Sequence, residues 1–222
     1  MKKSFFLLIV ILTIALSNQA QDMKPGSGDK SIELQFAPLS GSPVGINGLQ
    51  FRMFSGTSAY RANLFIGMTS EGKVHYDDNS TDSLKLEDTE SSFTFGLTPG
   101  IEFHMAGTDR LSPYCGVVVD FGMKTSTSKT QTKSKKIDTM TETGKDGWLR
   151  IGLNAPCGFD WYFTKHAYLG AELGFGFAMT SKSTIKRSTD AEGAVAPRDE
   201  EQGSTLNFGP NVNGQLRLGW IF

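Results

Sequence analysis

The chain has 222 residues, of which 38% are hydrophobic and 20% are charged, and its formal net charge is −1. This length fits one domain or two small ones, and the near-neutral charge argues against a nucleic acid partner, which would need a basic excess. The 25 glycines and 16 phenylalanines favour a narrow β-barrel, with glycine on the inside and aromatic rings on the outside.

The first twenty residues predict a secretory signal peptide. Lys2 and Lys3 give a positive start, and residues 5–16 (FFLLIVILTIAL) are apolar. This run is too short for a membrane helix, which needs about 20 residues, so we expect cleavage after Ala20. Residues 21–30 are polar, contain glycine and proline, and are expected to form a flexible leader before a single domain over residues 31–222.

From residue 31 onward, apolar and polar residues alternate with a period of two in eight segments, which predicts eight β-strands. These predicted strands are 31–38, 49–53, 60–68, 93–105, 114–124, 150–163, 169–179 and 206–222. The second, fourth and sixth connections are tight turns, whereas the third, fifth and seventh are polar segments of about twenty residues. This alternation predicts an all-β fold: an eight-stranded antiparallel up-and-down transmembrane β-barrel with short periplasmic turns and long outer loops.

Nine charged residues lie on the strand faces opposite the apolar rows: Glu33, Arg52, Arg61, Glu102, Asp120, Arg150, Asp160, Glu172 and Arg217. An arginine at the lipid midplane costs roughly 2–4 kcal/mol, so we expect the charged faces to line the lumen. The acids and arginines nearly balance, and eight strands enclose just enough space for side chains to fill. A plugged lumen held by a charge network is therefore favoured over an ion or proton path.

Five aromatic residues on the outward face are expected to form a girdle near the periplasmic end: Tyr60, Trp161, Phe163, Trp220 and Phe222. Pro99, Pro156 and Pro210 interrupt strands that have no free edge, and each predicts a β-bulge because proline donates no ladder hydrogen bond.

Cys115 and Cys157 are expected on the same outward face of adjacent antiparallel strands. If Lys124 pairs with Trp148, the register places the two cysteines opposite one another. The compartment permits a disulfide, and the local geometry decides between a bond and two lipid-facing thiols.

The outer segments contain no residue set that predicts a catalytic, metal or cofactor site. Residues 74–82 (VHYDDNSTD) are acidic with one histidine, but they lack the glycine and distal glutamate of a calcium loop. His104 lies beside Glu102 and is expected to be a hydrogen-bonded lumen residue rather than a titrating group. Five lysines of one outer segment either contact lipopolysaccharide phosphates or belong to a solvated loop: Lys129, Lys133, Lys135, Lys136 and Lys145.

Three segments resemble a known family: residues 112–117 (SPYCGV), 154–163 (NAPCGFDWYF) and 167–174 (AYLGAELG). They are similar to the outer-membrane protein β-barrel domain family, small OmpA/OmpX-like barrels common in Bacteroidetes-type bacteria. The resemblance covers residues 31–222 and implies a last strand that the outer-membrane assembly machinery recognises. On this resemblance Leu218, Trp220 and Phe222 would carry the assembly signal, and no shared activity is implied.

The expected function is therefore non-enzymatic: a protein of the cell outer membrane with a structural role, or one that binds an extracellular ligand or adheres through its surface loops. Its expected partners are outer-membrane lipid and lipopolysaccharide, the assembly machinery and an unknown extracellular ligand. Two alternatives stay open. One is a narrow channel for ions or small solutes, and the other is an enzyme acting on membrane lipid.

Overall fold

The computed structural model describes residues 23–36, 46–77, 84–132, 140–189 and 199–222. Its regular structure consists of β1 (Lys30–Phe36), β2 (Ile46–Ser55), β3 (Ser58–Asp77), β4 (Leu84–His104), β5 (Leu111–Thr132), β6 (Met140–Tyr162), β7 (Ala167–Lys182), β8 (Lys186–Thr189) and β9 (Ser204–Ile221). None of the described residues belongs to a helix long and apolar enough to cross a bilayer. The predicted signal peptide lies outside the described residues.

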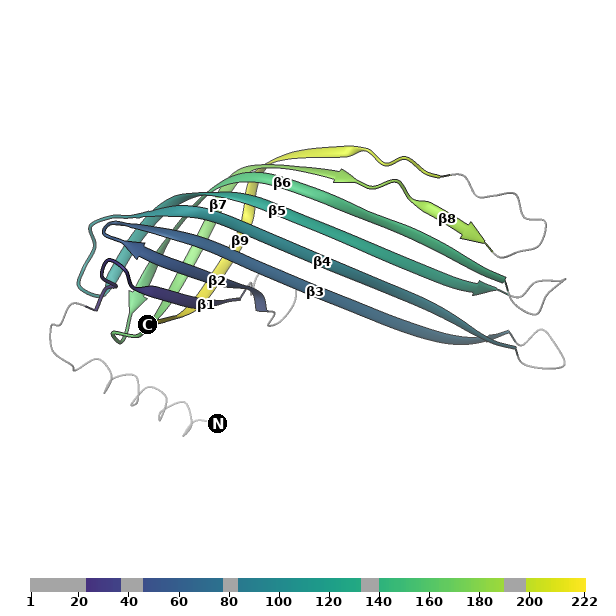
Figure 1. The fold of residues 1–222 in the computed structure, drawn as a ribbon, viewed down its shortest axis with the longest axis horizontal. Helices are drawn as coiled ribbons and strands as arrows, with labels where there is room; N and C mark the ends of the chain where they lie inside the picture. The colour runs from purple at the N-terminus through teal and green to yellow at the C-terminus, as the bar shows by residue number, and fades with distance from the viewer. Residues whose placement is uncertain (1–22, 37–45, 78–83, 133–139, 190–198) are drawn as a thin grey trace, which may run out of the picture.

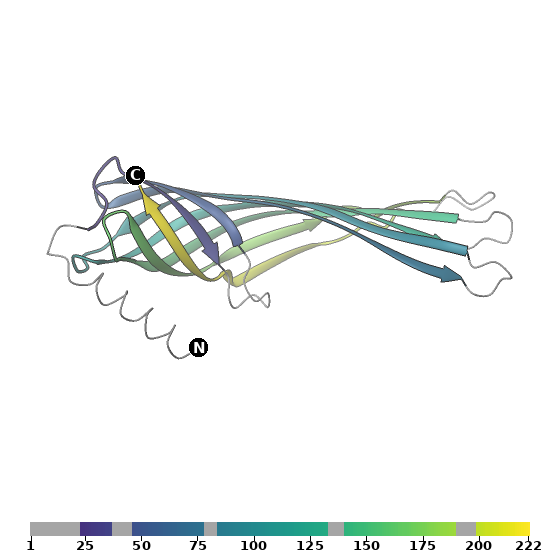
Figure 2. The same cartoon turned by 90° about the horizontal axis from the view of Figure 1, so that it is seen from below.

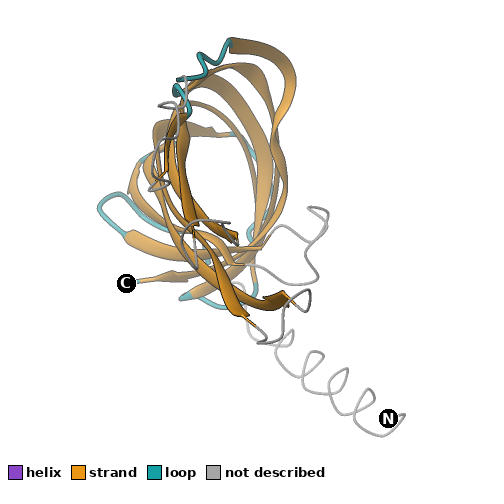
Figure 3. Cartoon of the chain, turned by 90° about the vertical axis from the view of Figure 1, so that its right-hand side faces the viewer, coloured by secondary structure: helices purple, strands orange, loops and turns teal. Residues whose placement is uncertain are grey.

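Eight strands form a closed antiparallel ring in the order β1-β2-β3-β4-β5-β6-β7-β9, because β9 pairs with β1 and β5 pairs with β6 (Figure 3). Strands that follow one another around the ring also follow one another in the chain, apart from the closing pair. The predicted eight-stranded up-and-down barrel is confirmed. The short strand β8 is an addition, which lies in the last outer segment and pairs only with the outer part of β6.

The barrel has a polar inside and an apolar outside, which is the reverse of a soluble protein. Along β7 every second residue from Gly170 to Ala178 is buried in the barrel, while Leu173, Phe175 and Phe177 are more than half exposed. An apolar surface of this kind is stable against lipid and unstable in water. The alternation therefore fits the sheet to a bilayer.

The height of the apolar band matches a bilayer. On β3 the outward row from Tyr60 to Met68 covers nine positions, and a tilted membrane strand needs about 9–11 residues. The upper border of the band follows the residue pairs Met68–Phe93, Met123–Leu149 and Met179–Leu206, with a step of two residues between one pair and the next. Beyond this line the outer face becomes mainly polar, so the strands leave the membrane there.

The outer segments are more ordered than the sequence suggested, because the strands continue through much of them. The β3–β4 pairing runs unbroken to Asp77 and Leu84, and the β5–β6 pairing reaches Thr132 and Met140. Once the two strands of a hairpin are paired in register, further pairs of threonine or serine residues can extend the pairing without a new nucleation step. Threonine also favours the strand conformation. The wall over β3 to β6 therefore extends far beyond β1 and β2 (Figures 1 and 2).

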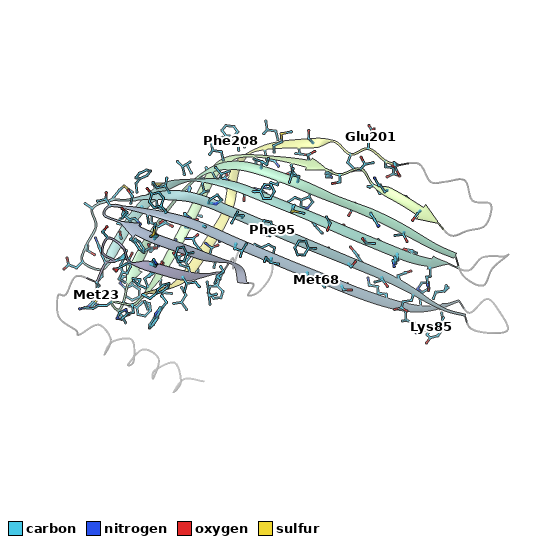
Figure 4. The ribbon with its side chains drawn as sticks, in the orientation of Figure 1. Met23, Met68, Lys85, Phe95, Glu201 and Phe208 are labelled. Carbon is cyan, nitrogen blue, oxygen red and sulfur yellow. A yellow bond between two sulfur atoms is a disulfide. The ribbon has the colours of Figure 1, made fainter. Side chains whose placement is uncertain are left out.

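One end of the expected leader lies against the barrel, whereas residues 26–28 are exposed, and the flexibility of the leader stays a prediction. Met23 is buried with Tyr162, Tyr168 and Ile221 at the end of the barrel that holds the tight turns, far from Lys85 (Figure 4). The backbones of Lys30 and Phe222 exchange two hydrogen bonds, of 3.1 and 2.9 Å. The start of the domain and its end therefore lie side by side.

The three prolines behave differently from one another. The β9 register shifts on both sides of Gly174, where β9 carries Pro210, so the bulge expected there is present. No register shift accompanies Pro99 or Pro156, and the bulges predicted at these two positions are wrong. Beside Pro99 the β4–β5 ladder omits two residue pairs and resumes in the same register, and beside Pro156 the β5–β6 ladder does the same. Each proline is therefore accommodated without an extra residue.

Candidate functional site

A cluster of seven charged side chains fills the half of the lumen next to the tight turns. We call it the lumen cluster, and its members come from seven of the eight ring strands: Glu33, Arg52, Arg61, Glu102, Asp160, Glu172 and Arg217. Every one of them is at most 6% exposed. They meet because each lies on the inward face of its strand and because the tight turns hold the strand ends level.

Two ion pairs of the lumen cluster cross the barrel between opposite strands. Arg52 of β2 and Asp160 of β6 approach to 2.7 Å between Nη1 and Oδ2. Arg61 of β3 and Glu172 of β7 approach to 2.6 Å between Nη1 and Oε2. In a ring of eight, strands four places apart face one another, so these pairs span the lumen at its full width.

The remaining ion pairs connect the two crossings. Arg217 bonds both Asp160, at 2.5 Å, and Glu33, at 3.2 Å. Glu102 accepts from Arg61 at 2.7 Å and also contacts Arg52 closely. The cluster is thus one continuous network that closes the lumen.

Neutral side chains complete the network. The hydroxyl of Tyr168 donates to Glu33 at 2.6 Å, that of Tyr114 donates to Glu172 at 2.5 Å, and Gln50 accepts from Arg61 at 2.5 Å. None of these three side chains was among the predicted members of the charge network. The available signal was their position: each lies on the same strand face as a lumen charge.

Three arginines and four carboxylates make up the lumen cluster. Tyrosine donors offset the single excess negative charge because they supply hydrogen bonds to the carboxylates. Removing one member of a buried ion network lowers the free energy of unfolding by about 3–5 kcal/mol, because its partners stay charged and have neither a counterion nor water. The chemistry of the cluster is therefore that of a fixed plug.

The structure does not bring Asp120 and Arg150 into the lumen cluster. They form a separate pair nearer the outer end, with Arg150 Nε 3.0 Å from Asp120 Oδ2 and both side chains about 30% exposed. Thr98 donates to Asp120 at 3.1 Å. These two predicted lumen charges thus line the open part of the barrel rather than its plug.

A cavity of about 320 Å³ lies between the lumen cluster and this outer pair. Arg61 and Glu172 belong to its floor, and its walls carry Asn63, Thr98, Asp120, Arg150, Asn154, Phe65 and Trp148. We call it the lumen cavity. Two further cavities, of about 160 and 280 Å³, follow it along the inner faces of β5 and β6, and consecutive cavities share lining residues such as Trp148 and Ser126.

His104 lies at the edge of the lumen cluster, as expected beside Glu102. Its Nδ1 atom is 2.9 Å from the Ser112 hydroxyl, and its Nε2 atom is 3.5 Å from Glu102. A serine, a histidine and a carboxylate in this order are the elements of a nucleophilic triad. Ser112 is only 4% exposed, however, and Glu102 is already bound by two arginines, so the arrangement serves packing.

Cys115 and Cys157 lie directly opposite one another in the β5–β6 register, with their Cα atoms 4.1 Å apart, and a disulfide joins them. The bond links two strands that the ladder already pairs. It lies on the outer, lipid-facing side of the sheet, away from the lumen cluster.

The three residues of the expected assembly signal, Leu218, Trp220 and Phe222, are exposed along the outward face of the C-terminal end. Trp220 stacks against His166 of the β6–β7 turn, with ring centroids 5.9 Å apart. Their recognition by the assembly machinery stays a prediction.

Of the outer-segment residues, Lys129 and Lys145 are exposed on the extended β5–β6 hairpin. Lys133, Lys135, Lys136 and the acidic stretch 78–82 lie outside the described residues. Within the described ranges, no group of three or more histidine, cysteine, aspartate or glutamate side chains is placed to hold a metal ion.

Searches against known proteins found similarity only at the level of solved structures. No family model and no curated protein matches the chain. The outer membrane protein OprG from Pseudomonas aeruginosa aligns at 14% identity over 91% of this chain and 99% of its own, with a TM-score of 0.45. CarO from Acinetobacter baumannii aligns at 13% identity over 91% and 100%, with a TM-score of 0.37. CarO2 from Acinetobacter baumannii aligns at 14% identity over 87% and 97%, with a TM-score of 0.34. Similarity at this level carries no argument about the function of this chain.

Proposed function

We propose that this chain is a small barrel of the bacterial outer membrane that is closed towards the periplasm and acts through its outer half, by binding an extracellular ligand. Its location rests on the apolar band, on the predicted signal peptide and on the antiparallel ring with tight turns at one end, which are features of outer-membrane barrels. The OmpA/OmpX-like type remains part of the proposal.

The observation that carries the proposal is the pair of ion bridges across the lumen. Arg52–Asp160 and Arg61–Glu172 join opposite strands, and their side chains are nearly inaccessible to water. An ion that passes along the barrel axis would have to separate these pairs, and each separation leaves a charge buried without its partner. The cavity lies on the outer side of the plug and has Arg61 and Glu172 at its floor, which favours binding over passage.

The direct test is conductance in planar bilayers. We expect no steady current steps from the unmodified protein, because the lumen cluster blocks the axis. The quadruple variant Arg52→Ser, Asp160→Ser, Arg61→Ser, Glu172→Ser removes both bridges and is expected to conduct. The matched variant Arg150→Ser, Asp120→Ser removes a pair outside the plug and is expected to stay closed. Steady steps from the unmodified protein would overturn the proposal.

A narrow channel is the second candidate, and one observation favours it. The lumen cavity already reaches Arg61 and Glu172, so the barrel is open on the outer side of the lumen cluster. A rearrangement of that cluster and of the buried residues Met23, Tyr162, Tyr168 and Ile221 would complete a path. Voltage-dependent steps that vanish when Arg61 and Glu172 are replaced by a pair of leucines would support this candidate.

Contact with lipopolysaccharide is a further part of the proposal. Lys129 and Lys145 are exposed above the apolar band, where the phosphates of an outer leaflet would lie. Replacing both by glutamine is expected to weaken binding to lipopolysaccharide in a detergent co-purification assay. Unchanged binding would mean that these two lysines are solvated surface residues that do not contact lipopolysaccharide.

A further inference from the structure

We propose that the lumen cavity binds a small neutral carbohydrate, or the end of a neutral saccharide chain, that enters from outside the cell. The inference rests on the proposed function, because it needs a barrel that is closed below and open above. The volume of about 320 Å³ lies at the lower end of the range for small-molecule sites, about 300–1,000 Å³.

The charges around the cavity exclude an ionic ligand. Its four charged lining residues are already paired, Arg61 with Glu172 and Arg150 with Asp120. At the buried Arg61–Glu172 pair, a charged ligand would leave the displaced member without a counterion, which is strongly unfavourable. At the partly solvated Arg150–Asp120 pair, exchanging one partner for a charged ligand gains little. A neutral ligand leaves both pairs intact.

The amide of Asn154 excludes a purely apolar ligand. This side chain lines the cavity and is 2% exposed, and neither its oxygen nor its nitrogen has a hydrogen-bond partner among the described atoms. A buried polar group without a partner is rare in native proteins and points to a missing ligand or water. Both amide atoms are nearly covered and lie close to Gly152 and Gly176. A ligand hydroxyl, which both donates and accepts, would therefore pair with the amide once the side chain turns into the cavity.

Two aromatic rings give the cavity flat apolar walls. A Cβ atom added at Gly67 would lie 3.0 Å from Cζ of Phe65, and one added at Gly122 would lie 3.1 Å from the indole ring of Trp148. Each ring therefore lies close to a glycine of the barrel wall. Glycine at these positions lets each ring lie against the barrel wall. Ligand sites combine apolar aromatic walls with a few fixed polar groups, and a sugar ring offers an apolar face and polar edges to match.

The route into the cavity has the same character. The cavities that follow it along β5 and β6 are lined by hydroxyl groups, among them those of Ser126, Ser128 and Thr130, and by the charged side chains of Glu90, Lys124, Asp146, Lys182 and Arg187. The hydroxyl groups can exchange hydrogen bonds with a saccharide. The extended wall therefore offers a polar path from the exterior to Trp148.

The test uses the full folded protein in an amine-oxide detergent, because a glycoside detergent would itself supply sugar. Saturation-transfer NMR with glucose, maltose and maltotriose as probes is expected to give ring-proton signals for at least one of them. Trp148→Leu and Asn154→Leu are each expected to weaken binding about tenfold, as for residues at the centre of a binding site. Leu149→Ala is the matched control, since Leu149 adjoins Trp148 but faces lipid, and its binding is expected to be unchanged.

The outcomes separate the two proposals. If none of the neutral saccharides gives a signal and the protein does not conduct, the carbohydrate assignment is overturned and the cavity holds only water, while the closed barrel stands. Equal signals from Trp148→Leu and the unmodified protein, or stronger signals from glycine or glucuronate, also overturn the assignment. Steady conductance overturns the closed barrel itself. Heat-modifiable gel mobility establishes that each variant is folded, and Trp148→Leu decides the matter if Asn154→Leu does not fold.

Discussion

Arg52 and Asp160 are 108 positions apart in the chain and lie on opposite walls of the barrel, yet their side chains meet at 2.7 Å in its centre. Arg61 and Glu172 repeat this arrangement one strand further round. Backbone pairing fixes only the distance between neighbouring strands. The crossing pairs also fix the distance between opposite strands, so they hold the cross-section of the ring.

The first prediction concerns Arg52, whose removal leaves Glu33, Glu102 and Asp160 without a shared cation. We expect Arg52→Met to lower the free energy of unfolding by about 3–5 kcal/mol, the range for one member of a buried ion network. Urea unfolding in detergent, followed by tryptophan fluorescence, measures the change. Arg150→Met is the control and is expected to cost no more than about 1 kcal/mol, because its pair is partly solvated. Equal losses would contradict the difference in burial.

The second prediction concerns Gly219, which lies on the inner face of β9 beneath the ring of Tyr168. A Cβ at this position would collide with that ring. We expect Gly219→Ala to cost about 1–3 kcal/mol, the usual penalty for overpacking. Gly203→Ala, where a Cβ meets nothing within 4 Å, is expected to be neutral in the same unfolding assay. A stable Gly219→Ala protein would mean that Tyr168 can move without loss.

The sequence was enough to predict the barrel, the facing of its strands and the lumen charges, because these follow from a period of two and from the cost of a charge in lipid. It was not enough to separate Asp120 and Arg150 from the other charges. All nine share the same facing, and only the height of each residue in the ring decides which of them meet. Tyr168 was missed for a related reason: a tyrosine beside a turn has the same pattern whether it lies in a girdle or in a lumen.

The third prediction concerns the disulfide between Cys115 and Cys157, which are 42 positions apart. We expect reduction to lower the free energy of unfolding by about 2–4 kcal/mol, mainly because the bond restricts the unfolded chain. The double variant Cys115→Ala, Cys157→Ala is expected to unfold at the lower value with or without reductant. Maleimide labelling of the unreduced, denatured protein would contradict the bond.

The fourth prediction separates the two roles of Phe222. Its backbone closes the ring through hydrogen bonds to Lys30, whereas its exposed ring is the expected assembly signal. Phe222→Ala keeps the backbone, so we expect normal refolding in detergent but a reduced yield in the outer membrane of cells. Deleting Phe222 is expected to reduce both. Normal membrane yield of Phe222→Ala would remove the ring from the assembly signal.

The fifth prediction concerns the hairpin that β3 and β4 form above the apolar band. Replacing residues 71–90 by Asn-Gly joins Ser70 to Ser91, which are already paired, and Asn-Gly suits a two-residue hairpin turn. We expect the shortened barrel to fold and to keep its heat-modifiable mobility, because the cut lies outside the band bordered by Met68 and Phe93. Failure to fold would show that the extended wall is needed for folding.

The closing of the ring has a consequence for how the barrel is made. Glu33 lies on the first strand and Arg217 on the last, so these partners meet only when β1 and β9 join. Until then the charges that will form the plug have no complete set of partners and must stay hydrated. A nascent barrel therefore holds its interior as a water-filled trough, and the joining of its two ends expels that water as the charges pair.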